Sequence, residues 1–207
     1  MEPTSVAITG TDDWLRLEVD TAALRHNIAG FRELVQRPAR LMAVVKSDAY
    51  GHGLLVAARA FLAGGADVLG VHTLAEATAL RRGGVAAPAL ILGPLREDEV
   101  RAAAALDCDV TVASAPAAEA ARRAADPDRP CRVHLKVETG VNRQGIREEE
   151  LDAVLAQIAD RPGLELVAVA SHFADIEDTT DHTFAQRQQD RFDRFLAMLA
   201  ARGLPDL

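Results

Sequence analysis

The chain has 207 residues, of which 49% are hydrophobic and 26% charged, so it is long enough to bury a sizeable core and has an ordinary globular composition. Its formal net charge of −8 argues against broad binding to nucleic acid or to an anionic membrane, but it leaves a local anion site open. Two cysteines without CxxC spacing indicate neither a disulfide framework nor a metal site, and the lack of a long apolar run or signal-peptide pattern predicts a cytoplasmic protein.

The hydrophobic pattern predicts alternating strands and helices along the chain. Alternating apolar residues at 15, 17 and 19 indicate a half-buried strand over residues 14–20, and Asp20 or Thr21 can cap the helix that follows. Six further strands are predicted at 41–45, 68–71, 89–92, 109–112, 131–137 and 166–170. Each is followed by a predicted amphipathic helix, at 54–63, 74–82, 97–106, 114–125, 148–159 and 183–201.

This order of elements defines the predicted fold class. Short, largely apolar strands that alternate with helices are typical of parallel strands covered on both faces. The stretch after the strand 41–45 lacks the glycine-rich turn of a nucleotide-binding doubly wound sheet, whereas a closed (β/α)8 barrel needs eight such units. We therefore predict an α/β fold of the (β/α)8 TIM-type barrel class, incomplete with about six units, over residues 14–207 after an N-terminal segment 1–13.

Lysine is rare in this chain. Of 23 basic residues only Lys46 and Lys136 are lysines, and arginine cannot replace lysine where the nitrogen must lose its proton and attack a carbonyl. An arginine-biased composition could leave two lysines by chance. Both, however, lie at the carboxyl ends of predicted strands, where the catalytic groups of TIM barrels lie. This position favours a Schiff-base role for Lys46.

Three other residues stand near predicted strand ends. Tyr50, the only tyrosine, could donate its hydroxyl to an anion or serve as a contact at the rim of the barrel. Arg143 lies in a loop whose glycines let the backbone approach a ligand, although it could equally be a surface arginine. His172 directly follows an apolar strand, where a structural histidine is as common as a functional one.

Three ordered motifs carry a resemblance to a known family. Residues 43–53 (AVVKSDAYGHG) resemble the pyridoxal-phosphate signature of the alanine racemases, with serine where alanine is usual. Residues 134–145 (HLKVETGVNRQG) resemble the second motif of that family, with Glu138 in place of the more usual aspartate and Val141-Asn142 in place of Met-Gly. Residues 171–174 (SHFA) match its third motif, so the resemblance extends over nearly the whole chain from Trp14 onward.

The resemblance implies a role for each of these residues. Lys46 would hold pyridoxal 5'-phosphate as a Schiff base and act as the catalytic base on the face that handles the D-amino acid. Tyr50 would bond the cofactor phosphate, and Leu92 would line the cofactor pocket. Two further cofactor contacts would come from Arg143, which would also bind the substrate carboxylate, and from His172 against the pyridine ring. Lys136 matches the lysine that some members carry in carbamylated form.

The resemblance also implies that part of the racemase machinery is not in this chain. The family continues into an Asn-Ser segment, an arginine that faces the pyridine nitrogen, and a C-terminal β-domain whose tyrosine reaches the active site of the partner subunit. The full-length protein is therefore expected to be a homodimer that supplies D-alanine for peptidoglycan, and the isolated chain is expected to have little or no activity. Two alternatives remain open: a non-catalytic pyridoxal-phosphate-binding barrel of cofactor homeostasis, or a racemase of another amino acid such as serine.

Overall fold

The computed structural model describes residues 17–175 and 180–204. The predicted N-terminal segment 1–13 lies outside the described residues, as do Trp14, Leu15 and Arg16. The chain divides into two compact units, one ending at Ile91 and the other beginning at Leu92. Each unit is described below by itself.

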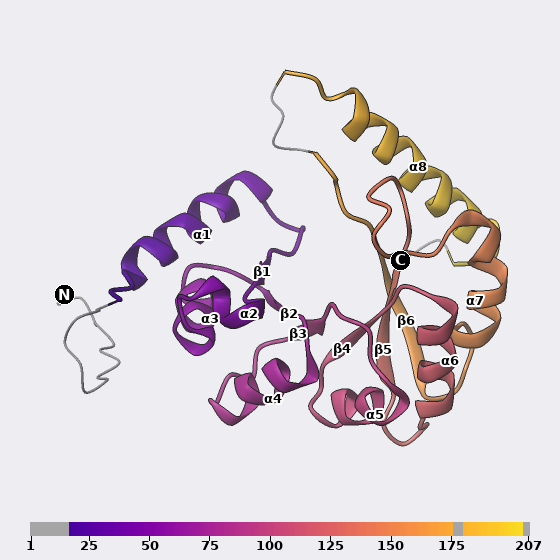
Figure 1. The fold of residues 1–207 in the computed structure, drawn as a ribbon, viewed down its shortest axis with the longest axis horizontal. Helices are drawn as coiled ribbons and strands as arrows, with labels where there is room; N and C mark the ends of the chain where they lie inside the picture. Colours follow the sequence, from indigo (N-terminus) through magenta and orange to yellow (C-terminus); the bar gives the residue numbers. More distant parts are fainter. Residues whose placement is uncertain (1–16, 176–179, 205–207) are drawn as a thin grey trace. The chain divides into compact units, whose positions relative to one another are not determined.

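The first unit contains three parallel strands and the helices between them (Figure 1). The strands β1 (Met42–Val44), β2 (Val68–Val71) and β3 (Ala89–Ile91) pair in that order, with Met42 opposite Val68 and Leu69 opposite Ala89. The helical elements are α1 (Thr21–Val35), α2 (Lys46–Tyr50), α3 (Leu54–Ala63) and α4 (Leu74–Arg82).

The start of α1 confirms the predicted cap. The Asp20 carboxylate accepts hydrogen bonds from the backbone N–H groups of Ala22 at 2.8 Å and Ala23 at 3.1 Å. The strand predicted over residues 14–20 is wrong for the part that the structure describes. Residues 17–20 belong to no strand, because among the described residues they have no neighbouring strand with which to pair. Alternating apolar residues indicate a strand only where such a partner exists.

The second unit also contains three parallel strands (Figure 1). Here β4 (Asp109–Val112), β5 (Cys131–Lys136) and β6 (Leu164–Ala170) pair in that order, with Thr111 opposite His134. The helices are α5 (Glu97–Ala105), α6 (Ala115–Ala124), α7 (Leu151–Ile158) and α8 (Thr183–Ala200). The predicted helix 148–159 begins as a 3-10 turn, η1 (Glu148–Glu150), before it continues as α7.

Burial follows the predicted pattern in some strands and departs from it in others. Every residue of β2 and β3 is buried, as expected for parallel strands that are covered on both faces. In β5, by contrast, buried Cys131, Val133 and Leu135 alternate with half-buried polar residues. The predicted cover is also incomplete at β1 and β6, where Val44 is 50% exposed and Val167 is 37% exposed. Within the described part of the chain, no helix has the length and apolarity to cross a membrane.

Candidate active site

Lys46 lies two residues beyond the end of β1 and begins a turn of unusual backbone conformation. Although α2 has the hydrogen bonds of a short helix, Ser47, Asp48 and Ala49 have φ values of 55°, 54° and 51°, and Tyr50 has a φ of 54°. Four consecutive residues with side chains are therefore left-handed, at a cost of about 1–2 kcal/mol each relative to the right-handed form. Such a segment persists only where surrounding contacts hold it, and segments of this kind concentrate at functional sites.

Two carboxylates stabilise this left-handed turn by accepting hydrogen bonds from backbone N–H groups. Asp48 accepts from the backbone N–H of Leu54 at 2.6 Å and so joins the turn to α3. Glu76, in the first turn of α4, accepts from the N–H of Ser47 at 2.6 Å and also from the N–H groups of His72 and Thr73 at 2.7 and 3.1 Å. Burial alone would raise the pKa of Glu76, but these three hydrogen bonds outweigh it and lower the pKa below its usual value. The carboxylate is therefore ionised near neutral pH.

In the second unit, three of the predicted site residues line one narrow cleft. Lys136 ends β5, Arg143 lies in the following loop, and His172 lies just beyond β6. The backbone carbonyl of Leu92, the predicted pocket residue after β3, accepts a hydrogen bond of 3.4 Å from the side chain of Gln144. The structure thus brings Lys136, Arg143 and His172 together and links Leu92 to the same loop.

The loop that carries Arg143 is organised around Glu138. The Glu138 carboxylate accepts a hydrogen bond from the backbone N–H of Gly140, and the backbone N–H groups of residues 141–143 also lower its pKa. Burial would raise the pKa of Glu138, but these backbone donors lower it below the usual value. The loop closes where Ile146 donates to the Lys136 carbonyl at 2.8 Å and Glu138 donates to the Ile146 carbonyl at 2.9 Å. A ring of N–H groups around one carboxylate therefore fixes the backbone from which the Arg143 side chain extends.

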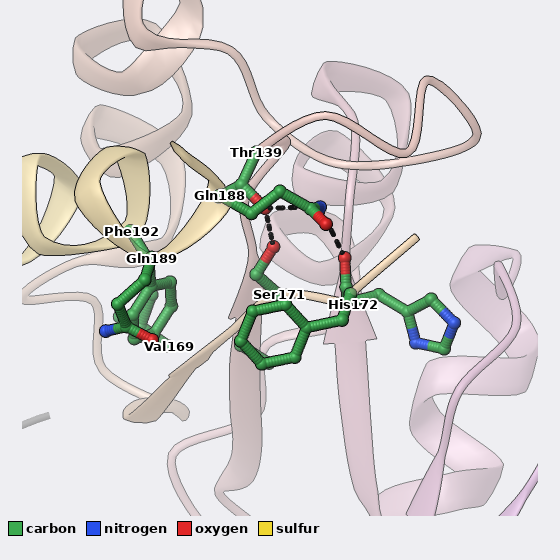
Figure 2. A pocket seen from close by; sticks show the side chains of 9 residues that line it. Thr139, Val169, Ser171, His172, Gln188, Gln189 and Phe192 are labelled. Carbon is green, nitrogen blue, oxygen red and sulfur yellow. Dashed lines mark hydrogen bonds between the residues drawn. The ribbon is translucent and has the colours of Figure 1, made fainter. Parts of the chain in front are cut away.

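A buried amide on α8 holds the segment that carries His172 (Figure 2). The side-chain nitrogen of Gln188, a residue only 2% exposed, donates to the His172 carbonyl at 2.9 Å and to the Thr139 hydroxyl at 3.3 Å. Its oxygen accepts from the N–H of Ala174 at 2.9 Å, and the Ser171 hydroxyl bonds the Thr139 hydroxyl at 2.6 Å. Figure 2 shows the imidazole of His172 pointing away from this cluster, so the cluster bonds the backbone and leaves the ring at the cleft.

A second polar group lies on the same strand face as Lys136. Arg132 and His134 alternate with the buried residues of β5, and both bond Asp109, at 2.6 and 2.9 Å. Burial would raise the pKa of Asp109, but the hydrogen bonds from His134 and Arg132 lower it below its usual value. The face of β5 that ends at Lys136 is therefore lined with hydrogen-bonded polar side chains rather than with apolar ones.

The predicted site residues are divided between the two units of the chain. Lys46 and Tyr50 lie in the first unit, on α2, and Tyr50 is 75% exposed. Leu92, Lys136, Arg143 and His172 lie in the second unit. Among the described residues, the Lys46 amine and the Arg143 guanidinium form no ion pair and no side-chain hydrogen bond, so both remain available to a ligand.

Sequence reasoning missed the side chains that hold these loops. Glu76 belongs to a capping box with Thr73, and this pattern is visible in the sequence, but its bond to Ser47 spans 29 positions and leaves no local signal. Gln188 lies at helical spacing on the same face of α8 as Ala185, Phe195 and Leu199, but its polar side chain argued for a solvated position rather than a buried one. Its burial between two loops follows from tertiary packing alone.

Parallel strands alternating with helices, and a lysine at a strand end, define the class of this protein as an α/β protein of the TIM-barrel type. The chain belongs to the alanine racemase family, because the family model "Alanine racemase, N-terminal domain" matches residues 19–207. Alanine racemase 2 of Oceanobacillus iheyensis is 36% identical over 189 residues, which are 91% of this chain and 47% of that protein. The alanine racemase of Syntrophobacter fumaroxidans is 38% identical over 192 residues, with 91% and 50% covered.

Solved structures agree with the sequence comparisons. The crystal structure of alanine racemase from Bacillus anthracis with bound L-Ala-P matches with a TM-score of 0.83 at 33% identity, over 90% of this chain and 48% of that one. The alanine racemase of Corynebacterium glutamicum matches with a TM-score of 0.82 at 33% identity, over 90% and 52%. These matches confirm the predicted family and fold class. The chain spans about half the length of the relatives that it matches.

Proposed function

We propose that this chain is the cofactor-lysine portion of a pyridoxal-phosphate-dependent alanine racemase, which interconverts L- and D-alanine. The observation that carries the proposal is Lys46, whose amine has no ion pair among the described residues and which lies just after β1 at the start of a strained left-handed turn, inside a chain that belongs to the alanine racemase family. The names of the relatives and of the matching crystal structures support alanine as the substrate.

The proposal gives each site residue one task. Lys46 attaches pyridoxal 5'-phosphate through its amine, and Tyr50 offers its hydroxyl to the phosphate. Arg143 binds the cofactor and the substrate carboxylate through its planar guanidinium, which suits an anion. His172 packs against the cofactor ring and Leu92 lines its pocket. Lys136, at the foot of the Arg143 loop, is the position at which a carbamate would pair with an arginine.

The described residues fit this cofactor. Its phosphate and the substrate carboxylate need cations and hydroxyl donors, which Arg143 and Tyr50 supply, and its carbonyl needs an amine that has no other partner. Bound pyridoxal phosphate supplies an electron sink that makes the α-hydrogen of an amino acid removable. The task of the chain is then proton transfer, with the Nζ atom of Lys46 removing or returning the α-proton on one face of the substrate.

A racemase needs a second base on the opposite face of the substrate. Tyr50 is the only tyrosine of the chain and is assigned to the phosphate, so the opposing tyrosine of the family has no counterpart here. We accordingly propose that the 207-residue chain alone has little or no racemase activity. A protein that carries both bases would be a homodimer in which the second base comes from the partner subunit.

Exchange of the α-hydrogen of alanine with solvent deuterium tests whether the chain supplies a base on one face of the substrate only. When the chain is incubated with pyridoxal phosphate in heavy water, we expect D-alanine to exchange its α-hydrogen without inversion, because the lysine face alone is present. L-alanine should neither exchange nor interconvert faster than with free cofactor, and Lys46→Arg should lose the exchange because a guanidinium stays protonated. Mass spectrometry with chiral separation checks both. Rapid interconversion by the chain alone, or exchange that persists in Lys46→Arg, would contradict the proposal.

A further inference from the structure

Glu76 differs from the other capping-box glutamates of the described chain by a contact with a distant loop. Three helical segments begin with a glutamate that accepts from the backbone N–H of its own cap residue: Glu76 from Thr73, Glu99 from Arg96 at 3.0 Å, and Glu150 from Arg147 at 2.9 Å. Capping is the complete local function of such a residue. Glu76 alone among them also accepts from a backbone N–H of a distant loop, that of Ser47 at 2.6 Å.

The Ser47 N–H lies at the point where the left-handed turn begins. The other hydrogen bonds of the turn are local: Ala49 donates to the Val45 carbonyl at 3.0 Å, and Gly51 and Gly53 donate to the Asp48 carbonyl at 3.1 and 3.0 Å. Local bonds stabilise a turn once it has formed, but they do not fix its direction relative to the strand ends. In the part of the chain that the structure describes, Glu76 is the side chain that joins this backbone to the loop after β2.

We propose that Glu76 is the positioning residue of Lys46: its carboxylate holds the N–H of Ser47 and so fixes the direction in which the Lys46 amine leaves the end of β1. This inference rests on the proposed function of Lys46 as the cofactor lysine. The carboxylate bridges the loops after β1 and β2, so the backbone of Lys46 is set by α4 as well as by its own strand. A lysine has four rotatable side-chain bonds, and fixing its backbone limits the volume that its amine samples.

The chain offers matched controls for this role. Glu76→Ala removes a capping box and the bonds from the N–H groups of His72 and Ser47, whereas Glu99→Ala removes a capping box and an ion pair with Arg96 but no bond to a distant loop. Thr73→Ala removes the other half of the same box, the hydroxyl that accepts from the Glu76 N–H at 3.2 Å, and leaves the carboxylate in place. Of the N–H groups bound by Glu76, only that of Ser47 lies in the left-handed turn, so an effect at residues 47–54 that is seen in Glu76→Ala and not in the two controls reports the bridge to Ser47.

Amide hydrogen exchange of the full 207-residue chain without cofactor is the first measurement. We expect amides of residues 47–54 to exchange roughly tenfold faster in Glu76→Ala, since a hydrogen bond to a charged group contributes on that scale. Glu99→Ala and Thr73→Ala should leave these amides protected. If Glu76→Ala is too unstable to measure, Glu76→Gln retains one acceptor oxygen and should give an intermediate rate. Equal protection of these amides in the wild type, Glu76→Gln and Glu76→Ala would overturn the inference.

Borohydride trapping of added pyridoxal phosphate on Lys46 is the second measurement, and it separates this inference from the proposed function. We expect the initial trapping rate to fall roughly tenfold in Glu76→Ala and to stay unchanged in Glu99→Ala. If the wild-type chain traps no cofactor but the amides of residues 47–54 exchange faster in Glu76→Ala, the proposed function is wrong, whereas the hydrogen bond from Ser47 to Glu76 still holds the turn. If the wild type traps cofactor and both alanine variants trap it equally fast, the positioning role is wrong.

Discussion

Gly145→Ala should lower the free energy of unfolding by about 3 kcal/mol and disorder the loop that carries Arg143. A β-carbon at this position would lie 2.6 Å from the Glu138 nitrogen and 2.7 Å from the Val137 carbonyl carbon, and the φ of Gly145 is +150°. Because the contacts are to backbone atoms, no side-chain rotation relieves them. The loop and the pairing of Ile146 with Lys136 would have to move.

Gly84→Ala is the matched control for Gly145→Ala. Gly84 also has a positive φ, +76°, but a β-carbon there would meet no atom within 4 Å. Only the backbone cost remains, about 1 kcal/mol. Urea unfolding followed by circular dichroism measures both variants. Equal losses in the two would mean that the close approach of Gly145 to Glu138 does not stabilise the loop.

Gln188→Leu should lower the free energy of unfolding by about 2–4 kcal/mol, because it removes the three hydrogen bonds that the buried Gln188 amide makes, at about 1 kcal/mol each, to the His172 carbonyl, the Ala174 N–H and the Thr139 hydroxyl. The leucine has a similar volume, so the cost comes from the lost hydrogen bonds rather than from a cavity. The second expected effect is on binding: the segment after β6 should loosen, and pyridoxal phosphate should bind more weakly because His172 is no longer held.

Gln186→Leu on the same helix is the control for Gln188→Leu. Gln186 is exposed and bonds only Asp190, one turn along α8, so its replacement should change stability by less than about 0.5 kcal/mol. Thermal unfolding measures the first effect, and titration of the visible absorbance with pyridoxal phosphate measures the second. A Gln188→Leu protein with wild-type stability and affinity would show that the amide cluster in Figure 2 has no such role.

The sequence predicted the order of elements well because each element carries its own local signal. The bounds of α3, β2, α4 and β4 agree with those predicted, since glycine pairs at 64–65 and 83–84 end the two helices, β2 is a short apolar run and β4 is rich in β-branched residues. The strand predicted at 14–20 is the exception. Its alternating pattern is local, but a strand depends on a pairing partner that no local pattern supplies.

The residues of the candidate site also divide into those that have a local sequence signal and those that have none. Lys46, Lys136, Arg143 and His172 could be named from rarity, strand-end position and motif, and the structure brings the last three to one cleft. The left-handed turn after Lys46 could not be predicted from the sequence, because Ser47, Asp48 and Ala49 are not residues that require this conformation. The roles of Glu76 and Gln188 could not be predicted either, because their hydrogen-bond partners lie on other elements. What escaped the sequence is therefore the support of the site rather than its chemical groups.

The central claim is that Lys46 is the residue that holds pyridoxal phosphate. The most direct test is to mix the chain with the cofactor, reduce with borohydride, digest the protein and locate the pyridoxyl group by mass spectrometry. We predict that the label lies on the peptide containing Lys46, is absent from the peptide containing Lys136, and disappears in Lys46→Arg. A label on Lys136, or one that survives in Lys46→Arg, would contradict the claim.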